Sequence, residues 1–132
     1  MVTLREREAN TVGGRAVLNE AIQVAVADLE SGEEFVPIVV TKDWGDCRVE
    51  RFGADELQEA RTRMRDLLSG SAGAGHCALA HDEQLADGRS ELLIQIGRMG
   101  GEEAEAFAQR YRPRRGRFRP FKLLGNPVAE GD

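Results

Sequence analysis

Residues 74–99, with the sequence AGHCALAHDEQLADGRSELLIQIGRM, decide the fold of this chain. Two stretches that favour extended structure flank Asp87-Gly88, a residue pair preferred in tight turns between antiparallel strands. Leucine and isoleucine recur at every second position from Leu92 to Ile96, which is the period of a strand with one buried face. The segment therefore predicts a β-hairpin whose arms are residues 74–85 and 89–99.

Two amphipathic helices come before this hairpin. Apolar residues follow helical spacing from Val17 to Leu29, and no glycine or proline interrupts them until Gly32, where a C-cap glycine belongs. This pattern predicts a helix from about residue 15 to residue 31. A second helix is predicted to begin near Asp55, a suitable N-cap residue, and to end at Gly70.

A second hairpin is predicted between the two helices. Residues 35–41 are rich in β-branched side chains, and residues 47–52 alternate in polarity, with turn-forming residues between them. Pro37 has no N–H to donate, so its strand lies at an edge of the sheet or places the proline on an unpaired side.

The C-terminal part predicts two more strands. Residues 103–113 favour a helix by their alanine and glutamate content, and a strand by the aromatic residues ahead of Pro113. We choose the strand, because a turn at Gly100-Gly101 returns the chain alongside the preceding strand. Residues 117–124 predict the final strand.

The resulting order, α-β-β-α-β-β-β-β, predicts an α+β protein. Strands joined by tight turns pair in an antiparallel way, and two amphipathic helices are enough to cover one face of a sheet. We expect a two-layer sandwich with a mainly antiparallel sheet and both helices packed on one face. A single domain is predicted for residues 14–128, between a frayed N-terminal segment at 1–13 and a tail at 129–132.

The composition is that of a soluble globular protein. The chain has 132 residues, of which 41% are hydrophobic and 31% charged, with 18 basic and 23 acidic side chains and a net charge of −5. It has two cysteines, no apolar run approaching the roughly 20 residues of a membrane span, and no apolar core of a secretory signal near its start. We therefore expect a cytoplasmic protein that does not associate with membranes.

Basic residues gather near the C-terminus. Residues 110–122, here called the basic ribbon, contain seven arginine or lysine residues and no acid, whereas all 23 acidic residues lie elsewhere. Such a separation creates a local field that attracts anions on an acidic protein. The predicted anion- or partner-binding residues are Arg110, Tyr111, Arg112, Arg114, Arg115, Arg117, Phe118, Arg119 and Lys122.

Two interpretations of the basic ribbon remain open. Its arginines pair with carboxylates of the same chain or of a second subunit, or they hold phosphates while Tyr111 and Phe118 stack on bases. If the ribbon turns at Arg115-Gly116, its charges lie on both faces. Trp44, at the tip of the hairpin predicted for residues 35–52, either packs back on that hairpin or on a neighbouring element, or marks a contact surface.

The histidines and cysteines do not predict a metal site. His76 and His81 are five positions apart on a predicted strand, so their side chains point to opposite faces. Cys77 and His81 share a face, but they are about 13 Å apart, which is too far for one metal ion. A disulfide between Cys47 and Cys77 is not expected in a reducing compartment. The sequence predicts no cofactor and no catalytic residue set.

Three functions remain open. The preferred one is a non-enzymatic binding or assembly protein that forms a homodimer through complementary acidic and arginine-rich surfaces. The second is a nucleic-acid or polyanion binder that uses the basic ribbon, although the acidity of the remaining chain repels phosphates over about 8–10 Å. The third is an enzyme for a small anionic substrate, whose candidate site residues are Arg110, Arg112, His76 and His81, although no spacing in the sequence supports their convergence.

Overall fold

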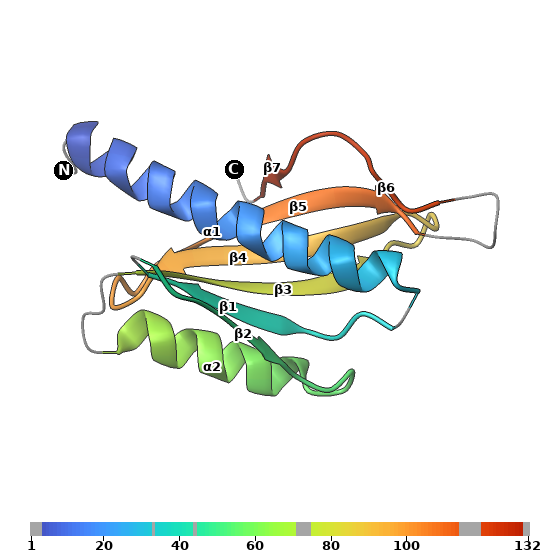
Figure 1. Ribbon diagram of the computed structural model, residues 1–132, viewed down its shortest axis with the longest axis horizontal. Coiled ribbons are helices and arrows are strands. Elements are labelled where there is room, and N and C mark those ends of the chain that lie inside the picture. Colours follow the sequence, from blue (N-terminus) through green and yellow to red (C-terminus); the bar gives the residue numbers. More distant parts are fainter. Residues whose placement is uncertain (1–3, 33, 44, 71–74, 114–119, 131–132) are drawn as a thin grey trace.

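The computed structural model describes residues 4–32, 34–43, 45–70, 75–113 and 120–130, with side chains from residue 13 on. One antiparallel sheet has the order β2-β1-β3-β4-β5-β6, and β7 also pairs with β5 (Figure 1). The elements are α1 (Leu4–Glu30), β1 (Ile38–Lys42), β2 (Cys47–Arg51), α2 (Leu57–Ser69), β3 (His76–Gln84), β4 (Ser90–Arg98), β5 (Ala104–Arg112), β6 (Lys122–Leu123) and β7 (Val128–Ala129). The predicted α+β class, element order and antiparallel sheet are confirmed.

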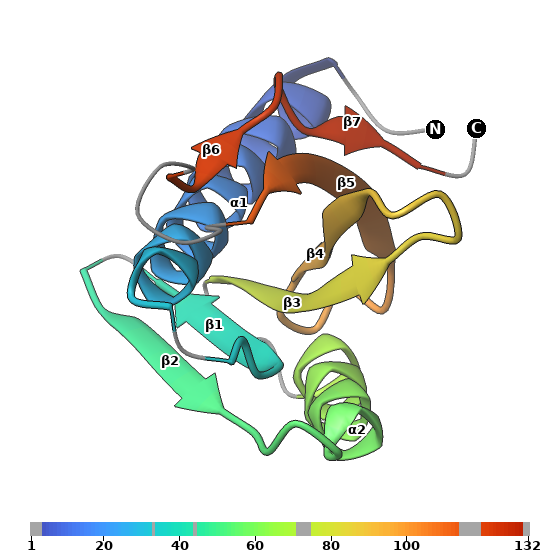
Figure 2. The same ribbon diagram turned by 90° about the vertical axis from the view of Figure 1, so that its right-hand side faces the viewer.

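The strand β3 lies inside the sheet and is buried on both of its faces. Ala78 and Ala80 belong to a core that includes α1, whereas Cys77 and Leu79 belong to a second core that includes α2. Successive side chains of a strand point to opposite faces of the sheet. The two helices therefore cover opposite faces, and Figure 2 shows the sheet between them.

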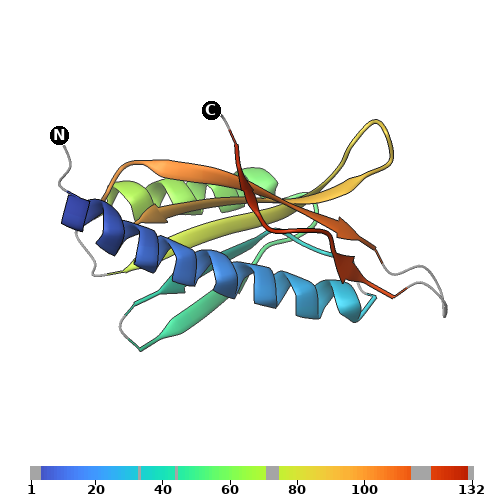
Figure 3. The same ribbon diagram turned by 90° about the horizontal axis from the view of Figure 1, so that it is seen from above.

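The expectation that both helices pack on one face is wrong. The long helix α1 packs on β1, β3 and β4 and forms the main two-layer body of the protein. The shorter helix α2 packs mainly on β1 and β3, on the other face. Neither described helix covers most of that second face of β4 and β5, and Figure 3 shows α1 and α2 on either side of the strands.

The main core is tight where α1 meets the sheet. Val17, Ala21 and Ala25 have no exposed surface, and they face fully buried strand residues such as Ile38 and Ile94. Burying each large apolar side chain contributes about 1.5–3 kcal/mol. This burial, more than helix propensity, holds α1 against the sheet.

The helix α1 begins at Leu4, well before the predicted start near residue 15 and inside the stretch expected to be frayed. Residues 4–9 are mostly strong helix formers, so the helix continues through Gly13-Gly14. The two glycines allow close packing. A Cβ atom on Gly13 would overlap the ring of His76, and one on Gly14 would lie 3.2 Å from Ile96 Cδ1.

Other boundaries differ in smaller ways. The N-cap residue of α2 is Glu56 instead of Asp55. The strand β1 is not an edge strand, and Pro37 precedes it, where its carbonyl accepts a hydrogen bond from the Phe52 N–H. The final strand β6 has only two described residues, and β7 was not predicted. In the parts of the chain that the structure describes, no helix combines the length and apolarity needed to cross a bilayer.

Gly97 lies under α2 and tests the placement of that helix. A Cβ atom on Gly97 would overlap Leu68 Cδ2 and lie 2.7 Å from the Glu103 carbonyl oxygen. We expect Gly97→Ala to lower the free energy of unfolding by about 1–3 kcal/mol in urea denaturation. Gly45→Ala is the control, because a Cβ atom there meets nothing within 4 Å. Equal stability of the two variants would contradict this packing.

Candidate anion-binding site

The end of β5 carries a buried tyrosine on one face and arginines on the other. Gln109 and Tyr111 are only 1% and 3% exposed and lie on the α1 side of the sheet. Arg110 and Arg112 alternate with them, so both point to the opposite face, where they are exposed. Arg110 and Arg112 thus share one face. That the charges of the whole ribbon lie on both faces stays a prediction, because residues 114–119 lie outside the described residues.

Four cations are side by side at this end of the sheet. Arg112 pairs with Lys122 of β6, so the two side chains share a face. Arg89 immediately precedes β4, and the β4–β5 register continued by one position places it beside Arg112. Arg110 lies one step along the same face. We call Arg89, Arg110, Arg112 and Lys122 the cationic cradle.

Two cradle arginines have carboxylate partners within the protomer. Arg89 Nε lies 2.5 Å from Asp87 Oδ2, and hydrogen bonds from Arg89 lower the pKa of the Asp87 carboxyl. Arg110 Nε lies 3.8 Å from Glu91 Oε1, which is a long ion pair. Both arginine side chains are about half exposed, so these pairs contribute little to stability.

The other two cradle cations repel each other. Arg112 Nη2 donates a hydrogen bond to the Pro120 carbonyl oxygen at 3.4 Å. Neither Arg112 nor Lys122 forms an ion pair with a carboxylate that the structure describes. Like charges directly opposite each other on neighbouring strands destabilise a sheet. An anion bound between Arg112 and Lys122 would remove this repulsion.

A cavity of about 320 Å³ opens beside the three arginines of the cradle. Its walls come from the turn before β4, the end of β5 and the residue that follows β6. It combines guanidinium groups with apolar surface, which suits an anion that carries an apolar group. The lining residues are Gly88, Arg89, Ser90, Arg110, Tyr111, Arg112, Pro113 and Leu124.

Tyr111 lies in the core on the α1 side of the sheet, behind the cradle. Its ring packs against Phe121 with the centroids 5.5 Å apart. Burial and the nearby Asp82 raise the pKa of Tyr111, whose hydroxyl also hydrogen-bonds Ser90. The ring is therefore held in the core and is not available to stack on a base, which removes one support for the nucleic-acid interpretation.

Five other predicted residues of the basic ribbon and the predicted contact residue Trp44 lie outside the described residues. The five are Arg114, Arg115, Arg117, Phe118 and Arg119. Arg89 and Leu124 were not predicted as site residues. The position of Arg89 could have been inferred from the predicted turn at Asp87-Gly88. A turn fixes the register of its hairpin, and therefore which residue comes just before the next strand. The neighbourhood of Leu124 and Arg110 could not be predicted from the sequence. It comes from a backbone hydrogen bond, in which the Leu124 N–H donates to the Arg110 carbonyl, and such a bond leaves no pattern in the side chains.

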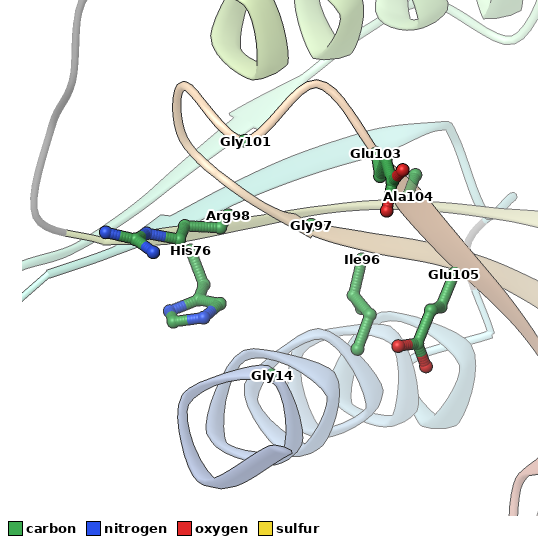
Figure 4. Close-up of a pocket in the computed structure, with 9 residues that line it drawn as sticks. All are labelled: Gly14, His76, Ile96, Gly97, Arg98, Gly101, Glu103, Ala104 and Glu105. Carbon is green, nitrogen blue, oxygen red and sulfur yellow. The ribbon is translucent and has the colours of Figure 1, made fainter. Parts of the chain in front are cut away.

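A second cavity, of about 260 Å³, lies at the other end of β5, under α1. His76 and Ile96 project from the sheet toward Gly14, and the Glu105 carboxylate lies beside Ile96 (Figure 4). His76 Nε2 is buried and has no hydrogen-bond partner among the described residues. Burial and the charge of Arg98 lower the pKa of His76. Its imidazole is therefore mainly neutral at pH 7.

The two histidines do not meet the arginines. His76 faces α1, and His81 shares the opposite face with Cys77, as their spacing predicts. Arg110 and Arg112 lie at the far end of β5 from the His76 cavity. The structure therefore does not bring together the four candidate residues named for an enzyme of a small anionic substrate. Among the described residues, no three metal-ligating side chains come together.

The two cysteines are free thiols on opposite faces of the sheet. Cys47 contacts Glu20 of α1, whereas Cys77 lies in the core under α2. Burial raises the pKa of the Cys77 thiol to about 11, so this thiol stays protonated.

No family model matches this chain, and no curated protein or solved structure is significantly similar to it. A function therefore has to be argued from the chemistry of the cradle and the surfaces around it.

The titration of His76 tests its burial. We expect the midpoint of the His76 ring-proton shift, followed by NMR, to lie below the ordinary value of 6.5. The folded state then binds fewer protons than the unfolded state, so this group's contribution to stability is lost as the pH falls below 6.5. The same titration in urea is the control, and a folded midpoint at or above the unfolded one would contradict the buried, neutral imidazole.

Proposed function

We propose that this protein is a non-enzymatic binding or assembly protein, which forms a homodimer by placing acidic side chains of one copy in the cationic cradle of the other. The observation that carries the proposal is the cradle itself. It has four cations on one face, and its only carboxylate partners among the described residues are Asp87 and Glu91.

The acidic counterpart lies at the start of the same strand. Glu102, Glu103 and Glu105 are exposed, and none of them forms an ion pair with a described residue. Glu105 is five residues from Arg110 along β5, which is about 17 Å. Exposed charges this far apart are largely screened from each other at physiological salt. The two ends of β5 therefore do not neutralise one another within a protomer.

A twofold axis would bring the opposite charges together. In a twofold dimer the acidic patch of each copy meets the basic patch of the other, so the same contact is made twice. Glu105 faces α1, but Glu102 belongs to the turn before β5, and its N–H donates to the Leu68 carbonyl of α2, on the cradle face. With the two β5 strands running in opposite directions, Glu102 of each copy approaches the cradle of the other. Complementary charge of this kind sets the register and the association rate of an interface.

A charge-swap experiment tests the homodimer. We expect light scattering after size exclusion to show a dimer at low salt that weakens at high salt. Arg112→Glu and Glu102→Arg should each weaken the dimer about tenfold, which corresponds to about 1.4 kcal/mol, and the double variant should recover much of the loss.

Arg48→Glu is the matched control, because it makes the same charge change on the exposed edge strand β2, far from the cradle. A monomer at both salt concentrations rejects the proposal. Equal weakening by Arg48→Glu would show that net charge, and not the cradle, controls association.

A further inference from the structure

The cavity beside the cradle arginines has features that a pure protein–protein contact does not need. It is a hollow of about 320 Å³, and three of its eight lining residues are arginines. Leu124 also lines it, and this side chain is 44% exposed. In the part of the chain that the structure describes, only Leu124 and Val128 are large hydrophobic residues with this much exposure. An exposed leucine beside guanidinium groups favours a ligand that has both an apolar part and a negative charge.

The guanidinium groups define the charged part of the ligand. Arginine presents N–H donors in a planar fork that matches a carboxylate or a phosphate. Arg112 is the least satisfied of the three, because its described partner is only the Pro120 carbonyl at 3.4 Å. Lys122 adds a positive charge beside it. These groups select an oxyanion.

The remaining walls define the apolar part and the size. Leu124 and Pro113 provide apolar surface. The volume is at the lower end of the range for ligand pockets, about 300–1,000 Å³. A hollow of this size holds a small molecule or a single side chain.

We propose that this cavity binds a small organic anion, a carboxylate or phosphate monoester carried on an apolar body, and that this ligand competes with the partner's carboxylates for Arg110 and Arg112. The competition rests on the proposed homodimer. Because linkage is reciprocal, a ligand that occupies the cradle weakens dimerisation by the same factor by which dimerisation weakens ligand binding.

Calorimetric titration with defined probes tests the binding. The probes are 4-phenylbutyrate and phenyl phosphate, with 4-phenylbutyramide as the uncharged analogue and inorganic phosphate as the anion without an apolar body. We expect both organic anions to bind saturably. The amide and inorganic phosphate should each bind at least about tenfold more weakly, because each lacks one of the two interactions.

Variants separate the two parts of the cavity. Arg112→Gln should weaken both organic anions about tenfold, whereas Leu124→Ser should weaken the organic anions and leave inorganic phosphate unchanged. Arg48→Gln is the matched control and should bind like the unaltered protein. The absence of saturable binding, or equal affinities in all these variants, overturns the proposal. Circular dichroism confirms that each variant is folded.

Size exclusion with and without 4-phenylbutyrate separates this inference from the homodimer. Loss of the dimer at saturating ligand supports the competition, and an unchanged dimer that still binds the ligand overturns it. A dimer that binds no probe removes the inference and leaves the homodimer standing. A monomer that binds the probes removes the homodimer and leaves the ligand site.

Discussion

The burial of β3 on both faces is the constraint on which the rest of the structure depends. Ala78 and Ala80 pack under α1, and Cys77 and Leu79 pack under α2, so one strand joins the two cores. Every other strand is placed by antiparallel pairing outward from β3. Once this strand has a defined face toward each helix, the register fixes which side chains of β4 and β5 face α1 and which face away from it.

This register explains why the cradle lies where it does. Side chains of β5 on the α1 side enter a core, whereas α2 packs mainly on β1 and β3 and leaves the other face of β5 open. Guanidinium groups are costly to bury without a partner, so they are tolerated only on the open face. Arg110 and Arg112 lie there because Gln109 and Tyr111 are buried on the other side.

Much of this arrangement was predictable from local patterns. The period of two from Leu92 to Ile96 and the Asp87-Gly88 turn are sufficient for the β3–β4 hairpin, whose turn has Gly88 at a φ of +85°. The position of α2 was not predicted, although Cys77 to Ala80 is an unbroken apolar run, the pattern of a strand buried on both faces. The cradle needed the register of three strands, which no local window of sequence contains.

The buried neighbours of the arginines also prepare the cradle to bind. Gln109 Nε2 donates hydrogen bonds to the carbonyls of Arg110 and Gly125, and Tyr111 packs against Phe121. These contacts hold the backbone on both sides of Arg110 before any partner arrives. Ordering a flexible segment on binding costs conformational entropy and so weakens the affinity. A backbone that is already fixed avoids this cost. Within the described part of the cradle, the arginine and lysine side chains are what remains to be ordered, so even a small anion can be held at this end of the sheet.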